Sequence, residues 1–175
     1  RMMTSIVLTV IGPDRPGLVS AVSDKAAEFG ANWADSLMAN LAGQFAGIVH
    51  LQVEAKNADA LIAALTSLEQ PGMRITAARG SDAAPAAPTR RLKLDLVGHD
   101  RPGIIHSISS QLAAHGVSID KLQTQIASGA MSGEQMFQMN AMLTVPAALA
   151  DDALRAALEG LANELMVDIE LDTSR

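Results

Sequence analysis

The chain has no cysteine and no tyrosine, and it has only three Phe and one Trp among its 175 residues. Without cysteine it can form no disulfide, no thiolate metal site and no cysteine nucleophile. The scarcity of aromatic residues leaves the core to Ala, Val, Ile, Leu and Met. Hydrophobic residues nevertheless make up 49% of the chain and charged residues only 18%. This composition is typical of a folded chain and excludes a disordered one.

Positive charge and long apolar runs are also scarce. Thirteen Lys and Arg against 19 Asp and Glu give a net charge of −6, which disfavours binding to nucleic-acid phosphates or to anionic membranes. No apolar run approaches the roughly 20 residues that span a bilayer. The apolar segment 6–11 is short for a signal peptide and is interrupted by Thr9. We therefore expect a cytoplasmic protein that contacts neither nucleic acid nor membrane directly.

One segment of the chain occurs twice. Residues 12–17 (GPDRPG) recur as residues 98–103 (GHDRPG), a shift of 86 positions. The same shift pairs Leu8 with Leu94, Val22 with Ile108, Ala27 with Ala113 and Gly30 with Gly116. Because the flanking apolar positions stay in register, the sequence predicts two copies of one structural unit.

The segment between the copies, residues 80–89, has small residues, two prolines and no large apolar side chain. Such a composition is typical of an exposed linker. The sequence therefore predicts one domain over residues 1–79, a linker over 80–89, and a second domain over 90–175.

Both halves show the same order of hydrophobic patterns. In each half, alternation of apolar and polar residues predicts a first strand. A 3.6-residue apolar period then predicts a helix, which ends at Gly30 in the first half and at Gly116 in the second. A hairpin, a second helix and a last strand follow. The expected hairpin strands are 32–41 with 44–54 and 118–127 with 134–145, the second helices carry Leu61 to Leu68 and Leu154 to Leu165, and the last strands are 73–78 and 166–172. This order predicts an α+β, ferredoxin-like (βαββαβ) fold with a four-stranded antiparallel sheet and both helices on one face. We also expect the two halves to pair within the chain. We further expect whole chains to form a homo-oligomer, because the long alternating strand 137–145 would otherwise leave an exposed sheet edge.

The repeated turn is the first candidate for chemistry. We expect its Asp to cap the following helix, its Pro to lie in the first helical turn, and its second Gly to leave backbone N–H groups open. An open helix start suits a carboxylate such as that of an amino acid. The plain structural interpretation, a well-capped helix start without a ligand, stays open. The residues concerned are Asp14, Pro16 and Gly17, and Asp100, Pro102 and Gly103.

The other polar residues give weaker patterns. The four histidines are His50, His99, His106 and His115, and no two of them are spaced i, i+4, the spacing that binds zinc on a helix. No nucleotide-binding glycine loop and no G-x-S-x-G motif is present. No set of acid, base and nucleophile recurs in both halves. We therefore expect no metal site, no cofactor and no enzymatic activity.

The repeated turn, the order of elements and the exits from the first helices together resemble the ACT domain family. These exits are Gly30-Ala31-Asn32 and Gly116-Val117-Ser118, where the family pattern is Gly-Ala-Asn. The resemblance implies that a small amino acid binds between paired domains, at the turn and at the start of the second strand. Carried over by position, the ligand-binding residues are Asp14, Arg15, Pro16, Gly17, Leu18 and Asn32 in the first half, and Asp100, Arg101, Pro102, Gly103, Ile104 and Ser118 in the second. Ser118 departs from the family's Asn.

The resemblance also implies a role. Two ACT domains without a catalytic or DNA-binding segment resemble regulators of glycine cleavage and amino-acid metabolism that control transcription through protein contacts. The expected ligand is glycine or serine, and the expected partner is a protein such as a DNA-binding activator. The alternatives are an interaction module that binds no ligand and a separate regulatory subunit of an enzyme of amino-acid metabolism.

Overall fold

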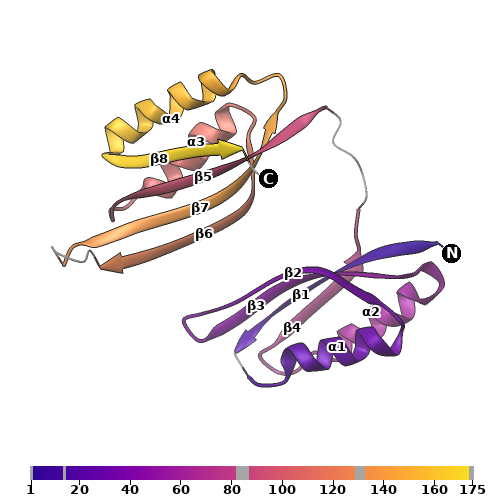
Figure 1. Ribbon diagram of the computed structural model, residues 1–175. Coiled ribbons are helices and arrows are strands. Elements are labelled where there is room, and N and C mark those ends of the chain that lie inside the picture. Colours follow the sequence, from indigo (N-terminus) through magenta and orange to yellow (C-terminus); the bar gives the residue numbers. More distant parts are fainter. Residues whose placement is uncertain (1, 14, 82–86, 129–132, 174–175) are drawn as a thin grey trace. The chain divides into compact units, whose positions relative to one another are not determined.

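The computed structural model describes residues 2–13, 15–81, 87–128 and 133–173, and it divides into two units, Arg1–Ala83 and Ala84–Arg175 (Figure 1). The elements of the first unit are β1 (Met3–Pro13), α1 (Leu18–Glu28), β2 (Asn32–Leu41), β3 (Gln44–Glu54), the short 3-10 helix η1 (Ala55–Asn57), α2 (Ala58–Thr66) and β4 (Arg74–Arg79). Those of the second are β5 (Thr89–His99), α3 (Ile104–Ala114), β6 (Ser118–Ser128), β7 (Gln135–Pro146), α4 (Asp151–Leu165) and β8 (Val167–Thr173).

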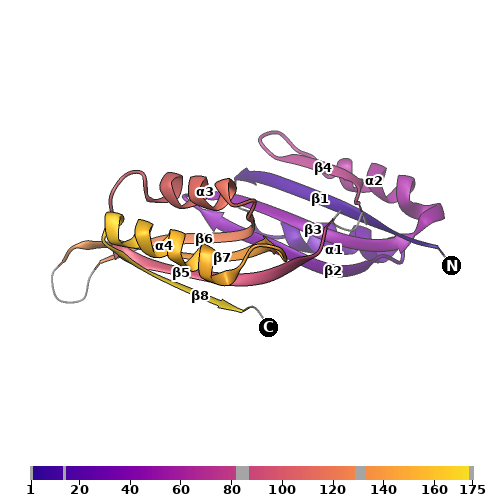
Figure 2. The same cartoon turned by 90° about the horizontal axis from the view of Figure 1, so that it is seen from above.

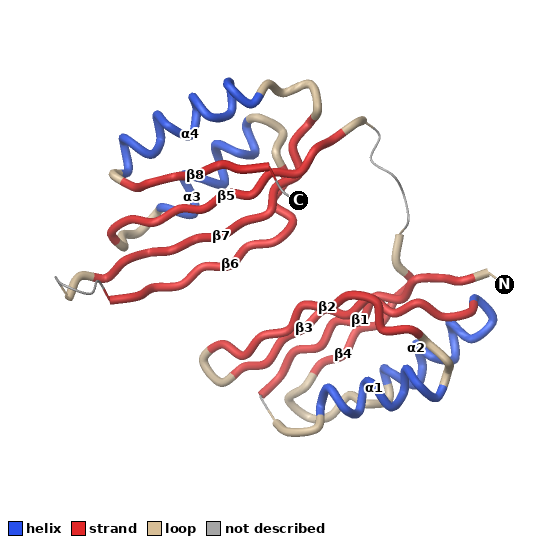
Figure 3. Tube along the Cα trace, in the orientation of Figure 1, coloured by secondary structure: helices blue, strands red, loops and turns tan. Residues whose placement is uncertain are grey.

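Each unit contains one four-stranded antiparallel sheet. The strand order is β2-β3-β1-β4 in the first unit and β6-β7-β5-β8 in the second. In each unit both helices lie on the same face of the sheet, as Figures 2 and 3 show. The predicted ferredoxin-like fold is confirmed. The strand 137–145, however, belongs to β7, which lies between β6 and β5, so it is not an exposed edge and was the wrong reason to expect chain association.

Alternation along the strands builds the two cores. Ile6, Leu8 and Val10 of β1 are fully buried on the helix side of the first sheet. Leu92, Leu94 and Leu96 repeat this pattern on β5, where they pack with Ile104, Ile108 and Leu112 of α3. Among the described residues no polar or charged residue is buried. Each core is therefore an apolar layer between one sheet face and two helices, which leaves the other sheet face open for function.

Local signals fix most element ends. Gly30 and Gly116 end the first helices with φ of 66° and 71°. The N–H of the following residue donates back to the helix; in the first unit, Ala31 N–H donates to Ala26 O at 2.9 Å. The first hairpin turns at Ala42 and Gly43, both with positive φ, and its strands have the predicted bounds. The second hairpin loop lies largely outside the described residues. The second helix of the first unit ends at Thr66, before the Leu68 that the sequence pattern had included.

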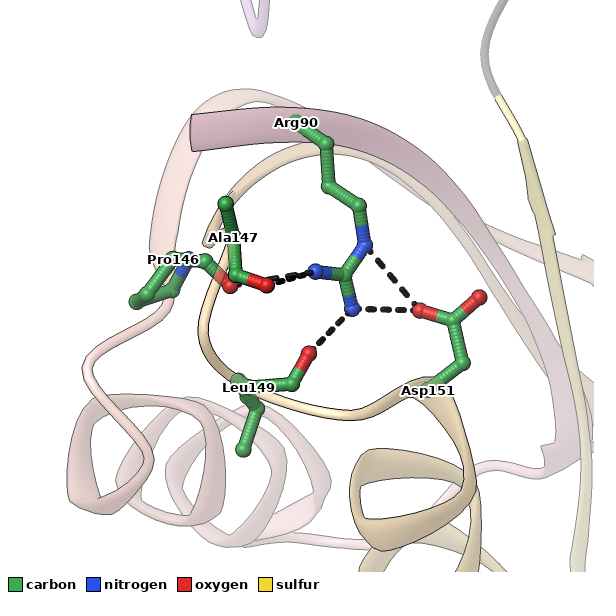
Figure 4. Close-up of polar contacts among 5 residues, drawn as sticks. All are labelled: Arg90, Pro146, Ala147, Leu149 and Asp151. Atoms are coloured by element: carbon green, nitrogen blue, oxygen red, sulfur yellow. Dashed lines mark hydrogen bonds and ion pairs between the residues drawn. The ribbon is translucent and has the colours of Figure 1, made fainter. Parts of the chain in front are cut away.

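One arginine holds the connection between β7 and α4 (Figure 4). Arg90 on β5 donates Nη1 to the carbonyls of Pro146 and Ala147 at 3.1 and 3.3 Å, and Nη2 to the carbonyl of Leu149 at 2.5 Å. Its Nε and Nη2 both bond the Asp151 carboxylate at the start of α4, with Nε at 3.1 Å. The equivalent position in the first unit is Thr4, so this arrangement is particular to the second unit.

Within the described part of the chain, no helix has the length and apolar character needed to cross a membrane.

Candidate functional site

The repeated turns lie between the first strand and the first helix of each unit. Gly17 and Gly103 precede the helices with φ of 89° and 93°, the left-handed region that favours glycine. A Cβ at either position would meet nothing within 4 Å. The turn glycines are therefore required for backbone conformation, and the helix starts beside them are open to solvent.

Two details of the predicted turn are wrong. Asp100 does not cap α3, because the N-cap residue is Gly103 and no side-chain cap hydrogen bond is present. The Asp100 backbone N–H donates to Gln135 O at 2.9 Å. Pro16 and Pro102 precede the glycine that flanks each helix instead of lying in the first helical turn. The physical reason is that the left-handed glycine separates the proline turn from the helix. Asp14 lies outside the described residues.

The open helix starts are suited to an anion. The first bonds within the helices are Ala21 N–Gly17 O at 2.9 Å and Ser107 N–Gly103 O at 3.0 Å, so the preceding N–H groups lack partners within their helix. These N–H groups and the helix dipole favour a carboxylate. Leu18 and Ile104 are only 4% and 2% exposed and belong to the two hydrophobic cores, so their side chains are not available to a ligand.

Arg15 is tied to its own unit. Its Nη1 donates to Gln70 Oε1 at 2.6 Å, and its Nη2 lies 3.9 Å from Met73 Sδ. Both partners precede β4. These contacts hold the guanidinium against the segment that precedes β4.

Within a unit the structure does not bring all the predicted ligand residues together. Asn32 begins β2 and Ser118 begins β6, each just after the C-terminal end of the helix whose N-terminal end carries the turn. Each of these helices has 11 residues, which corresponds to about 16 Å. A small amino acid cannot span that distance. A site that uses both groups therefore cannot lie within one unit.

The first glycine of each repeated turn has a separate, structural role. A Cβ on Gly12 would lie 2.9 Å from Met73 Cα, and one on Gly98 would lie 2.4 Å from Val167 Cγ1 and 3.1 Å from Val167 Cα. Gly98 pairs directly with Val167 of β8. These glycines let the first strand approach the beginning of the last strand closely.

Two of the four histidines that the sequence analysis considered for metal binding, His99 and His115, have ordinary hydrogen-bonding partners. His99 Nδ1 lies 3.0 Å from Glu134 Oε2, and His115 Nδ1 lies 2.9 Å from Gln111 O. Three carboxylates, those of Asp95, Glu170 and Asp172, gather on the open face of the second sheet within 4.8 Å of one another. Asp95 also contacts Asn140 and Lys93.

Sequence reasoning missed a cluster on the open face of the first sheet. His50 Nδ1 lies 2.7 Å from Asp35 Oδ1, and His50 Nε2 lies 2.8 Å from Ser5 Oγ. The three residues line a cavity of about 520 Å³. They lie on three different strands, and no local motif links them, so only the register of β1, β2 and β3 reveals the cluster.

Comparison with known proteins agrees with this architecture. A model of the ACT domain matches residues 4–76 and 91–172. A crystal structure of a protein of unknown function from Galdieria sulphuraria is 32% identical, with a TM-score of 0.86, over 99% of this chain and 100% of that one. A protein described as a candidate glycine cleavage system transcriptional repressor is 19% identical, with a TM-score of 0.66, over 100% of this chain and 99% of that one.

A search of curated proteins finds no match. The family model covers both units. The structure shows the repeated turn, the strand order and the placement of the helices independently of that match. The chain belongs to the ACT domain family and carries two ACT domains in tandem.

Proposed function

We propose that this protein is a regulator that senses a small amino acid and acts on a protein partner. The observation that carries the proposal is the pair of open helix starts behind Gly17 and Gly103, in two tandem ACT units. Glycine and serine are the first candidate ligands, because each presents a carboxylate to the helix start with little steric bulk. We propose a protein such as a DNA-binding activator of transcription as the partner. The structure described as a candidate glycine cleavage system transcriptional repressor shares the fold of this chain.

A thermal-shift screen of the twenty amino acids tests the sensing role. A ligand that binds only the folded state raises the free energy of unfolding by about 2.7 kcal/mol at 100 times its Kd, which is a rise in melting temperature of the order of 10 °C. We expect such a rise with glycine or serine. If no amino acid raises the melting temperature at millimolar concentration, the interaction module that binds no ligand becomes the better interpretation.

A charge placed at the helix start distinguishes binding there from binding elsewhere. Ser20 is exposed in the first turn of α1, and His106 holds the corresponding place in α3. Ser20→Asp and His106→Asp should leave the helices intact or slightly more stable, because an acid in the first turn suits the helix dipole. The same acid repels a ligand carboxylate. We expect each variant to melt no lower than the parent while the ligand-induced shift becomes smaller.

The two sites should differ in affinity. Asn32 offers an amide donor and a carbonyl acceptor, whereas Ser118 offers only a short hydroxyl, and both side chains are exposed at the start of a strand. We expect Asn32→Ala to cost roughly 1–3 kcal/mol of binding free energy, and Ser118→Ala to cost less. Calorimetric titration of both variants measures the difference. Equal losses, or a loss in Ser118→Ala alone, would reverse this ranking of the sites.

Association of chains is part of the proposal, because a ligand site that uses both the turn and the start of the second strand needs a second ACT unit. The edge strands are β2 and β4 in the first sheet and β6 and β8 in the second, and pairing along such edges covers unpaired backbone groups. We propose a homo-oligomer. Light scattering that reports a monomer at high protein concentration would exclude association between chains.

A further inference from the structure

We propose that Ser5, His50 and Asp35 form a second site, in which the Ser5 hydroxyl is a nucleophile toward esters with a short apolar acyl group. The site lies on the open face of the first sheet, and the proposal does not depend on amino-acid sensing. It stands on the placement of the three side chains, on the hydrogen bonds that join them, and on the cavity beside them.

Strand register places the three side chains on one face. Ile6 and Leu8 of β1 are buried on the helix side, so Ser5 and Val7 lie on the opposite face. His50 of β3 pairs with Val7 and also with Asp35 of β2. The three polar residues therefore come from three neighbouring strands and converge at one end of the open face.

A β-bulge is what brings the carboxylate to this face. The β2–β3 register shifts between Trp33 and Asp35, so that Trp33 pairs with Leu51 and Asp35 pairs with His50. Without the extra residue, strict alternation would place Asp35 on the helix side. Bulges of this kind re-aim side chains and are frequent beside functional sites.

The hydrogen bonds match the arrangement of nucleophile, base and orienting group. The two His50 contacts, 2.7 Å to Asp35 and 2.8 Å to Ser5, use the two ring nitrogens separately. In the neutral tautomer that this network implies, Nδ1–H donates to Asp35 and Nε2 accepts the Ser5 O–H. Nε2 is thus in position to take the serine proton during attack, while Asp35 holds the ring.

The second unit shows that the ACT fold does not need this trio. The equivalent positions, by strand register, hold Arg91 for Ser5, Met142 for His50 and Lys121 for Asp35. The second sheet has the same bulge and the same strand pairing with none of the three groups. A structural requirement of the fold therefore does not explain the cluster.

The cavity indicates the class of substrate. Its volume of about 520 Å³ lies within the range of small-molecule sites. Beside the polar trio its walls include Val7, Leu37 and Ile48, and the last two are 49% and 47% exposed. These walls suit a short apolar acyl chain.

The reaction balances without a cofactor. Ser5 Oγ attacks the ester carbonyl carbon, its proton moves to His50 Nε2, and the ester C–O bond breaks as the leaving alcohol takes that proton. Water then attacks the acyl-Ser5 ester, gives one proton to His50 and releases the acid, and the proton returns to Ser5. The Asp35 side chain is 83% exposed and the His50 side chain is 33% exposed. Water therefore competes for the hydrogen bonds of both side chains, and turnover should be slow.

The test combines a covalent probe with a chromogenic ester. Full-length protein is treated with a fluorophosphonate probe and mapped by mass spectrometry, and release of p-nitrophenol from p-nitrophenyl butyrate is followed. We expect an adduct on Ser5 and hydrolysis that is lost in Ser5→Ala. His50→Gln should lower labelling and hydrolysis about 100-fold, the lower end of what a general base supplies, and Asp35→Asn should lower them less.

Ser23→Ala is the matched control, since Ser23 is an exposed serine on α1, which covers the opposite face of the first sheet, and it does not line the cavity. It should label and hydrolyse like the parent. Circular dichroism and melting temperatures establish that all variants are folded. No adduct on Ser5, or equal labelling of the parent and His50→Gln, would overturn the proposal and leave the trio as a hydrogen-bonded surface cluster.

Discussion

Replacing Gly98 with Ala is expected to lower the free energy of unfolding of the second unit by about 3 kcal/mol, at the upper end of the usual cost of overpacking. The new Cβ would lie 2.4 Å from Val167 Cγ1 and 3.1 Å from Val167 Cα, closer than carbon atoms approach without movement. Rotation of Val167 can relieve the first contact but not the second, because Gly98 and Val167 are register partners. The strain must therefore shift β8 against β5.

The same change in the first unit tests whether the role is shared. A Cβ on Gly12 would lie 2.9 Å from Met73 Cα, a backbone atom that no rotamer change moves. We expect Gly12→Ala to destabilise the first unit by a similar amount, about 2–3 kcal/mol. Calorimetric unfolding, analysed for the two units separately, measures both losses.

Gly160 provides the control. It lies within α4, and a Cβ there meets nothing within 4 Å. Gly160→Ala should raise the stability of the second unit by up to about 1 kcal/mol, because alanine is the better helix former. If Gly98→Ala is as stable as the parent, the close approach of β5 and β8 is not what requires glycine in the repeated turn.

Replacing Arg90 with Ala should cost the second unit about 2–3 kcal/mol. The substitution removes charge-assisted hydrogen bonds to the Asp151 carboxylate and to the carbonyls of Pro146, Ala147 and Leu149. The side chain of Arg90 is 30% exposed, so water replaces part of this network and the loss stays below that of a fully buried pair. Urea unfolding of the full chain measures the change.

Two further variants identify the cause of that loss. Arg90→Lys keeps the positive charge but cannot reach the carboxylate and three carbonyls at once, so we expect it to recover only a small part of the stability. Arg91→Ala removes an exposed neighbour on the same strand and should change the stability by less than about 0.5 kcal/mol. Full recovery in Arg90→Lys would mean that charge alone, and not the branched guanidinium, holds the loop.

The sequence was sufficient for features that depend on a few neighbouring residues. The glycines at 17, 30, 103 and 116 adopt positive φ, and an Ala-Gly pair closes the first hairpin, because these conformations are decided within one turn of chain. Alternating and helical patterns identified the strands and helices, since burial of one face imposes the period. Together with the internal repeat, these local signals were enough to predict two ferredoxin-like units.

Only the tertiary structure decided which distant residues meet. The sequence pattern could not show that Asp100 leaves the helix uncapped or that Arg90 reaches the start of α4.

The Ser5–His50–Asp35 cluster shows the physical reason most directly. These residues are 15 to 45 positions apart in the chain, and their meeting depends on strand order, on register and on one bulge that moves Asp35 to the other face of the sheet. A one-residue change in register moves every side chain of a strand to the opposite face. Local sequence fixes the period of a strand, whereas packing of the whole sheet fixes its register, and the cluster depends on the register.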